Sequence, residues 1–148
     1  LTSMVSDAGF EAQGLAQTRE GQVLVDVDDG IWVEGDSRAL RLVVDNLLDN
    51  SFKYADGQPR IFLSLSLQHG FSLLQVVDQG IGMDPRELPK SFRRFWRGDE
   101  KRGGTGLGLA LAQAIARAHR GDLFVHSEGF GHGVVAECWI PVASEGEG

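Results

Sequence analysis

The sequence predicts a two-layer α/β (α+β) sandwich, in which a mixed, mostly antiparallel sheet of five strands has about three helices on one face. Two observations lead to this expectation. Residues 60–68 and 71–78 are rich in Leu, Val, Ile and Phe and are separated by only two residues, as in an antiparallel hairpin. Residues 37–54 and 107–119 instead carry their apolar residues at helical spacing.

The composition fits one globular domain. The chain has 148 residues, 42% of them hydrophobic and 24% charged, which is enough for a core of its own. Twenty glycines are about twice the usual share, but only four prolines accompany them, so collagen-like and low-complexity chains are excluded. We expect residues 1–20 to be a helical lead-in, residues 21–143 the body of the domain and residues 144–148 a flexible tail. Cys138, the single cysteine, lies in a strand-like run and is expected to be a core residue.

The first third of the chain is predicted to hold two helices and two short strands. Residues 23–27 and 31–33 are strand-like and flank an Asp-Asp-Gly turn. Asp36 is the expected N-cap of the helix 37–54, because its carboxylate can accept hydrogen bonds from first-turn amides. The apolar side of the N-terminal helix is expected to carry Met4, Val5, Ala8, Ala12 and Leu15.

Two further helices and two strands are predicted after the hairpin. Asp84-Pro85 is typical of a helix start, and this helix is expected to end near Trp96. Gly121 is expected to end the helix 107–119. The apolar stripe of that last helix is predicted at Leu107, Leu111 and Ile115. The strands that complete the sheet are predicted at residues 122–127 and 134–140.

The distribution of charge is uneven. The net charge is −7, but residues 86–102 carry +4 and the rest of the chain −11. An acidic chain does not suit general nucleic-acid binding, whereas a local basic segment beside a glycine-rich loop suits a small polyanion; a solvated helix face is the alternative. No apolar run approaches the roughly 20 residues needed to cross a bilayer, so we expect no membrane contact by this chain.

The predicted helix 37–54 carries polar residues of a kind that bind nucleotides. Asn46 and Asn50, the only asparagines, lie about 40° apart on one face, and Lys53 and Tyr54 follow on that side. A carboxamide oxygen suits Mg²⁺, an ammonium suits phosphate and a phenol can pack on a base. Ordinary surface polar residues are the alternative. The adjacent core face is predicted to hold Leu40, Val43, Val44, Leu47, Leu48 and Ser51.

Two glycine motifs accompany that helix. Asp78 ends a predicted strand, where its carboxylate can accept a hydrogen bond from an exocyclic amino group such as adenine N6. Gly80 and Gly82 follow it and would let the backbone pass close to a flat ring; an ordinary turn is the alternative. Residues 103–109 lead directly into a predicted helix, whose free amides can cradle phosphates. The spacing matches neither a P-loop nor a dinucleotide fingerprint.

These segments, taken in order, resemble the sequence boxes of sensor histidine kinases. The N box, first glycine box, F box and second glycine box correspond to residues 46–54, 78–82, 92–97 and 104–109. The catalytic ATP-binding domain of those kinases belongs to the superfamily shared with gyrase, MutL and the ATP-dependent heat-shock chaperones. The resemblance spans about residues 20 to 141 and implies the Bergerat-type ATP-binding fold, with residues 21–143 as the ATP-binding catalytic domain.

The resemblance implies a role for each matching residue. Asn50 would be the Mg²⁺ ligand, with Asn46 beside the metal and phosphates, Lys53 on a phosphate and Tyr54 against the adenine. Asp78 would accept a hydrogen bond from adenine N6. Ser51 stands where Ala is common in the family.

The remaining boxes imply a base pocket, a phosphate cradle and a mobile ATP lid. The pocket would be shaped by Gly80 and Gly82, and the hinge of the lid anchored by Phe92 and Phe95. Arg97 would contact the triphosphate, and Lys101 and Arg102 are candidate contacts to the γ-phosphate. The phosphates would be held by Gly104, Thr105, Gly106, Leu107 and Gly108.

The resemblance favours a protein-histidine kinase that uses ATP and Mg²⁺. Hydrolysing relatives and the anti-sigma serine kinases usually carry a general-base Glu where this chain has Asn46, and an amide cannot take a proton. The alternatives are an anti-sigma-type serine kinase or ATPase, and a non-catalytic nucleotide-gated binding module.

None of the four histidines lies in a His-Glu/Asp-x-x-x-Pro segment. We therefore expect the phosphoacceptor and dimerisation domain, through which a response regulator would be reached, to lie outside this chain. The isolated chain is expected to bind ATP without labelling itself. The resemblance also implies a cytoplasmic domain, with an inner-membrane or plasma-membrane sensor kinase as one kind of parent.

Overall fold

The computed structural model describes residues 1–53, 58–78, 108–126 and 133–143. The predicted helix 85–96 and the basic segment 86–102 lie outside these ranges. The elements follow in the order α1 (Thr2–Gln17), β1 (Gln22–Val27), α2 (Ser37–Lys53), β2 (Arg60–Gln68), β3 (Phe71–Asp78), α3 (Gly108–Ala118), β4 (Asp122–His126) and β5 (Val134–Pro141).

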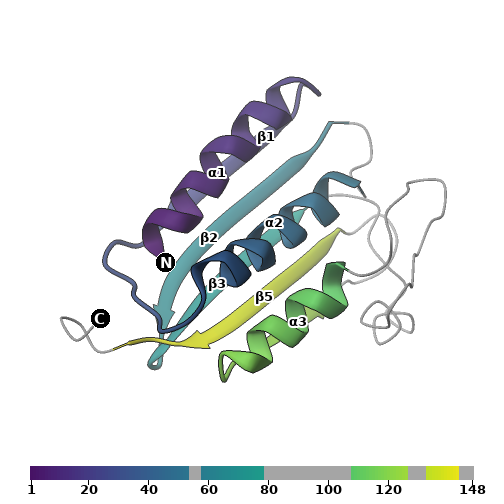
Figure 1. The fold of residues 1–148 in the computed structure, drawn as a ribbon. Helices are drawn as coiled ribbons and strands as arrows, with labels where there is room; N and C mark the ends of the chain where they lie inside the picture. Colours follow the sequence, from purple (N-terminus) through teal and green to yellow (C-terminus); the bar gives the residue numbers. More distant parts are fainter. Residues whose placement is uncertain (54–57, 79–107, 127–132, 144–148) are drawn as a thin grey trace.

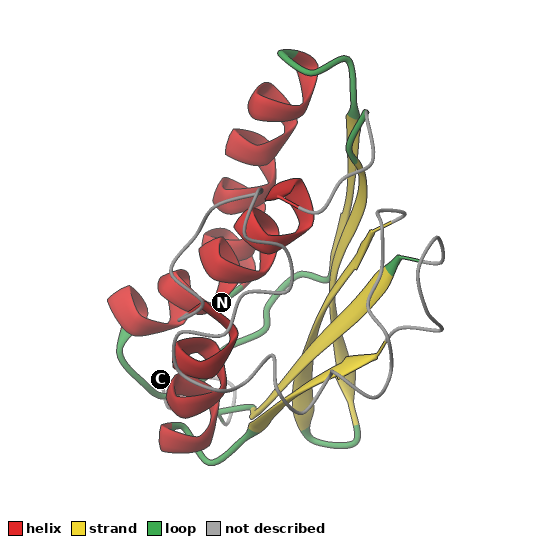
Figure 2. Ribbon diagram, turned by 90° about the vertical axis from the view of Figure 1, so that its right-hand side faces the viewer, coloured by secondary structure: helices red, strands yellow, loops and turns green. Residues whose placement is uncertain are grey.

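The five strands form one sheet in the order β1-β2-β3-β5-β4. β1 pairs with β2 in parallel, and the other three pairings are antiparallel. The three helices lie side by side over one face of this sheet (Figure 1), so that the molecule has a helical and a sheet layer (Figure 2). The predicted mixed two-layer sandwich is therefore confirmed.

The hairpin between β2 and β3 forms as predicted. Gln68 pairs with Phe71, which leaves His69 and Gly70 as a two-residue turn. Both turn residues have positive φ, 52° and 84°. Positive φ at both positions is the geometry of a type I′ turn, whose twist matches that of the flanking strands.

Helix α2 is the central helix, and it buries the face that its sequence predicts. Its start is capped as predicted, because Asp36 Oδ1 accepts hydrogen bonds from the amides of Arg38 and Ala39 at 2.9 and 3.3 Å. The buried residues of α2 are Leu40, Val43, Val44, Leu47, Leu48 and Ser51. They pack with inward-facing residues of the strands, such as Leu63, Leu65 and Val76, in the core.

Residues 31–33 do not form the predicted strand. The backbone of Ile31 instead joins the start of α1: its carbonyl accepts from the Leu1 amino group at 3.1 Å, and its amide donates to Thr2 Oγ1 at 3.0 Å. The carbonyl of Trp32 accepts from the amide of Ala143 at 2.7 Å. These groups therefore connect the start of the first helix and the residues just after the last strand to one loop.

The apolar faces of α1 and α3 differ in part from the prediction. Leu15 is exposed, and Ala16 takes the buried place at that end of α1. Leu111 is exposed as well, and Ile115 is only partly buried. The buried face of α3 consists of Leu109, Ala112 and Ala116. Small residues on the inner face let both helices lie close to the layer beneath them.

Gly121 follows the end of α3 as expected, but the left-handed residue at this helix end is Arg120 and not Gly121. Arg120 takes the left-handed conformation, with φ of 68°, and the amide of Gly121 donates to the carbonyl of Ala116 at 2.9 Å. A Cβ at Gly121 would overlap the carbonyl oxygen of Trp139. Glycine is therefore required here by a close approach of backbones. The same hydrogen-bonding arrangement ends α1 at Ala16, Glu20 and Gly21.

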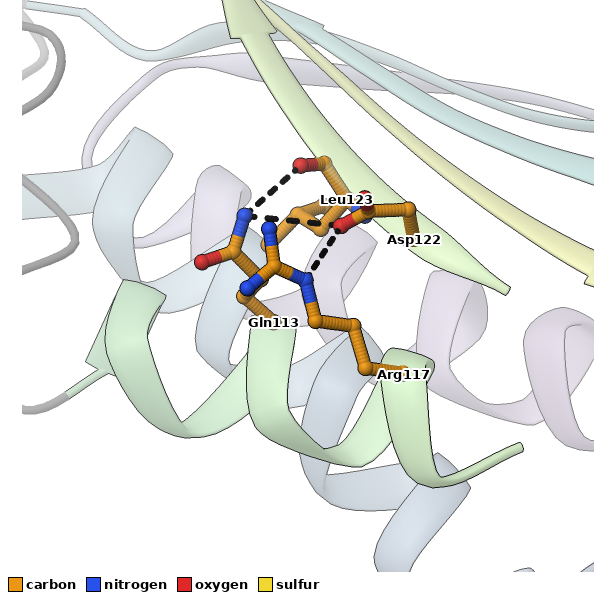
Figure 3. Close-up of polar contacts among 4 residues, drawn as sticks. All are labelled: Gln113, Arg117, Asp122 and Leu123. Atoms are coloured by element: carbon orange, nitrogen blue, oxygen red, sulfur yellow. Dashed lines mark hydrogen bonds and ion pairs between the residues drawn. The ribbon is translucent and has the colours of Figure 1, made fainter. Parts of the chain in front are cut away.

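A polar cluster holds α3 against β4 (Figure 3). Asp122 Oδ1 accepts hydrogen bonds from the Leu123 amide at 2.8 Å, from Arg117 Nε at 3.1 Å and from Gln113 Nε2 at 3.4 Å. Gln113 Nε2 also lies 3.3 Å from the Leu123 carbonyl oxygen. Desolvation by itself would raise the pKa of Asp122, but these hydrogen bonds and the Arg117 charge outweigh it and lower the pKa.

His119 has a structural role just after the end of α3. Its Nδ1 lies 2.8 Å from the carbonyl oxygen of Ile115, and its Nε2 accepts a hydrogen bond from the Asp36 amide at 3.1 Å. The ring therefore joins the end of α3 to the start of α2. This contact fixes how the two helices lie relative to each other.

Cys138 is 2% exposed on the inner side of β5, so its predicted place in the core is confirmed. Burial, with a smaller contribution from Asp122, raises the pKa of its thiol to about 12. Among the described residues, no helix is both long and apolar enough to cross a membrane.

Candidate functional site

Five of the predicted site residues lie within the described structure: Asn46, Asn50, Lys53, Asp78 and Gly108. They belong to α2, to the end of β3 and to the start of α3. The other predicted site residues lie outside the described ranges; they are Tyr54, Gly80, Gly82, Phe92, Phe95, Arg97, Lys101, Arg102, Gly104, Thr105, Gly106 and Leu107.

Helices α2 and α3 meet directly at two of these residues. Asn46 Nδ2 donates a hydrogen bond to the carbonyl oxygen of Gly108 at 3.3 Å, although the two residues are 62 positions apart in the chain. Gly108 is the first residue of α3, and Asn46 is half-buried. The predicted N box thus contacts Gly108, which belongs to the predicted second glycine box and begins α3.

Asn50 lies one turn further along α2, on the same side as Asn46, and is also half-buried. Lys53 is exposed in the last turn. The hydrogen bond from Asn46 to Gly108 uses the amide nitrogen of Asn46. It does not involve the carboxamide oxygen, which is the atom suited to a cation. Two neutral oxygen donors beside a helix start are a donor set that fits Mg²⁺ carrying phosphate oxygens and water.

Asp78 is the last residue of β3 and lies between β2 and β5, in register with Ile61 and Val134. Its side chain is 7% exposed and points to the helical side of the sheet, like the other buried residues of β3. Ser51 Oγ of α2 lies 3.2 Å from Asp78 Oδ2. A carboxylate buried at a strand end, with a polar neighbour, is suited to recognising a hydrogen-bond donor.

Arg19 supports the last turn of α2. Its Nη1 donates to the carbonyl oxygen of Phe52 at 2.9 Å, and its guanidinium carbon lies 6.0 Å from the centre of the Phe52 ring. This contact links the residues just after α1 to the last described turn of α2. Sequence reasoning missed Arg19, because an arginine just after a helix carries no local signal of a partner 33 residues away.

The carboxylate next to Asn46 is bonded elsewhere. Asp45 Oδ1 accepts from Arg41 Nε at 3.0 Å, and Arg41 Nη2 also bonds Glu11 of α1 at 2.6 Å. The hydrogen bond that Arg41 donates to Asp45 is the main cause of a raised Arg41 pKa. Desolvation by burial is the main cause of a raised Asp49 pKa. The charge of Lys53 opposes this rise, and the charge of Asp45 adds to it. Asp45 thus serves the contact between α1 and α2.

Comparison with known proteins agrees with the fold and the sequence boxes. Residues 35–144 match the family described as histidine kinase-, DNA gyrase B- and HSP90-like ATPases. Among curated proteins, the chain is 34% identical to the sensor histidine kinase RppB of Synechocystis over 97% of its own length. It is 35% identical to the sensor histidine kinase WalK of Bacillus subtilis over 81%. It spans 33% and 20% of the lengths of those two proteins.

Solved structures show the same architecture. The mycobacterial sensor histidine kinase MprB superposes with a TM-score of 0.79 at 28% identity, covering 95% of each chain. Full-length ShkA superposes with a TM-score of 0.84 at 23% identity, covering 96% of this chain and 30% of that one, and this likeness concerns the fold. The chain therefore belongs to the histidine kinase-, DNA gyrase B- and HSP90-like ATPases, and within them it is similar to the ATP-binding catalytic domains of sensor histidine kinases.

Proposed function

We propose that this chain binds Mg-ATP where α2, the end of β3 and the start of α3 meet, and presents the γ-phosphate to a histidine of another domain. The observation that carries the proposal is the hydrogen bond from Asn46 to Gly108, because it joins two of the nucleotide-binding boxes at one place. The buried carboxylate of Asp78 ends the strand that runs beneath α2.

Each described residue has a chemical role in this proposal. Asn50, with Asn46 beside it, offers carboxamide oxygens to Mg²⁺, which would neutralise phosphate charge when bound. Lys53 offers an ammonium group to a phosphate, and the amides at the start of α3, which begins at Gly108, offer donors to phosphate oxygens. Asp78 accepts the hydrogen bond from the 6-amino group of adenine.

Residues outside the described ranges complete the proposed site. Tyr54 would pack on the base, Gly80 and Gly82 would shape its pocket, and Phe92 and Phe95 would anchor the lid hinge. Arg97, Lys101 and Arg102 would contact the triphosphate. The phosphate loop would consist of Gly104, Thr105, Gly106 and Leu107.

The residues favour phosphoryl transfer to histidine over hydrolysis. Asn46 cannot act as a base toward water or a hydroxyl, and the neighbouring Asp45 is bonded to Arg41. A neutral imidazole already has a lone pair. Its nitrogen attacks the γ-phosphorus, the bond to the bridging oxygen breaks, and ADP leaves. An ATPase or serine kinase would need a base that these residues do not supply.

The acceptor histidine belongs, in this proposal, to a phosphoacceptor and dimerisation domain of a longer parent protein. The chain spans a third or less of the length of the two curated relatives compared, so they contain further domains. A response regulator would receive the phosphoryl group from that domain. The parent would present this domain in the cytoplasm, as an inner-membrane or plasma-membrane sensor does.

Calorimetric titration of Mg-ATP tests the proposed site. We expect Asn50→Ala to weaken binding by about tenfold or more and to reduce its dependence on Mg²⁺, since metal-site changes commonly cost 10- to 100-fold. Gln68→Ala, which removes an exposed carboxamide at the far end of β2, should leave both unchanged. Unchanged affinity and metal dependence in Asn50→Ala would remove Asn50 from its role.

Incubation with γ-labelled ATP tests the reaction. The isolated chain should bind the nucleotide without becoming labelled, because the acceptor histidine lies elsewhere. Incorporation of acid-labile phosphate would contradict this expectation, and acid-stable phosphate on a serine would favour the serine-kinase alternative.

A further inference from the structure

Ser51 and Asp78 form a buried polar pair between the two layers of the fold. Ser51 is 4% exposed and Asp78 is 7% exposed, and Ser51 Oγ lies 3.2 Å from Asp78 Oδ2. The residues are 27 positions apart, one on the core face of α2 and the other at the end of β3. The contact therefore depends on the packing of α2 on the sheet.

The hydroxyl of Ser51 has a choice of two acceptors. Its Oγ also lies 3.2 Å from the carbonyl oxygen of Leu47, one turn back in α2. A hydroxyl carries a single hydrogen, whereas an ionised carboxylate only accepts. A hydrogen bond to an ionised carboxylate is about twice as strong as one between neutral groups, so Asp78 in its ionised form is the preferred partner of the hydroxyl. A hydroxyl that bonds Oδ2 restrains the rotation of the Asp78 carboxylate.

We propose that Ser51 is a positioning residue that orients Asp78 toward the 6-amino group of adenine and thereby favours adenine over purines that lack this donor. The inference rests on the proposed function and names the determinant of base choice at that site. Ser51 touches Asp78 rather than the nucleotide, so its effect should depend on the 6-amino group.

The test compares ATP with purine riboside triphosphate, which is ATP without the 6-amino group. Both are titrated into wild type and Ser51→Ala in the presence of Mg²⁺. We expect Ser51→Ala to weaken ATP binding by about three- to tenfold, the range for loss of one buried hydrogen bond. The affinities of the two proteins for the analogue should agree within about twofold, since the analogue has no 6-amino group from which Asp78 could accept a hydrogen bond.

Ser72→Ala is the matched control. Ser72 is 1% exposed in β3, and its hydroxyl donates to the carbonyl oxygen of Ile140 at 3.0 Å, at the other end of the strand from Asp78. Its removal takes away a buried hydroxyl of the same kind and should leave the ratio of the two affinities unchanged. Ser51→Cys keeps the size of the side chain with a weaker donor and should give an intermediate ratio.

The outcomes separate this inference from the proposed function. A lower preference for ATP in Ser51→Ala, with an unchanged preference in Ser72→Ala, supports the positioning role. An equal loss of both nucleotides, or no loss of either, overturns it while leaving the ATP site in place. Wild-type protein that binds neither nucleotide overturns the proposed function and this inference together.

Discussion

The side-chain amide of Asn46 reaches the carbonyl oxygen of Gly108 across 3.3 Å and so joins α2 to the first residue of α3. Between them lie 61 residues of chain that include the hairpin of β2 and β3. The contact keeps the asparagine face of α2 beside the start of α3. A nucleotide bound there would meet carboxamides from one helix and backbone amides from the other.

Asn46→Asp should destabilise the fold, because the substitution removes the donor and places a carboxylate oxygen against the Gly108 carbonyl oxygen. We expect a loss of about 1–2 kcal/mol in the free energy of unfolding, measured by urea denaturation at neutral pH. Asn50→Asp introduces the same charge one turn along α2 and is the control. Equal losses in the two variants would show that charge, not the contact with Gly108, causes the effect.

Asp122→Asn should make stability less dependent on pH. The folded-state pKa of Asp122 is lowered, so its stabilising contribution is present above its ordinary value of about 3.8 and is lost as the pH falls through the folded value. At pH 7 we expect the variant to lose about 0.5–1 kcal/mol, as is usual for a partly exposed ion pair. Unfolding curves recorded between pH 7 and 2 should converge for the two proteins at the acid end.

The exposed Asp29 in the loop after β1 provides the control for that series. Asp29→Asn should follow the wild-type curve within a few tenths of a kcal/mol at every pH, since surface changes commonly stay in that range. If the difference between wild type and Asp122→Asn stays constant down to pH 2, the hydrogen bonds to Asp122 do not depend on its charge.

Local patterns in the sequence predict much of this fold. The core face of α2 follows from helical spacing alone, and the cap at Asp36 from the residue type at its start. The turn at His69-Gly70 follows from two apolar runs separated by two residues. In each case the relevant interactions are within a few residues of one another, so the sequence contains the information locally.

Other features depend on contacts between distant segments. The Ile-Trp-Val run at 31–33 has high strand propensity, yet its backbone instead joins the start of α1 and the residues just after β5. Hydrophobicity favours Leu111 for the core, whereas close packing selects the smaller Ala112 and Ala116. The contact of Ser51 with Asp78 likewise needs the three-dimensional arrangement, although the sequence identifies both positions.

Gly14→Ala and Gly121→Ala should change stability in opposite directions. A Cβ at Gly14, in the last turn of α1, meets nothing within 4 Å, so alanine should stabilise the helix by about 0.5–1 kcal/mol. A Cβ at Gly121 would overlap the Trp139 carbonyl oxygen, so alanine there should cost about 2 kcal/mol or more. Thermal unfolding of both variants checks the pair. A Gly121→Ala protein as stable as wild type would contradict the close approach.

The thiol of Cys138 should be unreactive in the folded protein. Its reactive form is the thiolate, and burial with a pKa of about 12 keeps that form rare. At pH 8, a disulfide reagent such as dithionitrobenzoate should react only after denaturant is added. Ser3→Cys, which adds a thiol on the exposed side of α1, should react at once with one equivalent of reagent. Reaction of native wild type at the rate of Ser3→Cys would contradict the buried position.

Titration of the isotope-labelled protein with Mg-ATP, followed by ¹H–¹⁵N NMR, tests most directly whether the nucleotide binds where α2, β3 and α3 meet. Among the residues that the structure describes, the largest shifts are predicted at Asn46, Asn50, Asp78 and Gly108. The turn at His69-Gly70, at the opposite end of β3, should hardly change. Large shifts at that turn, with none at Asn50 and Asp78, would contradict binding of Mg-ATP at this place.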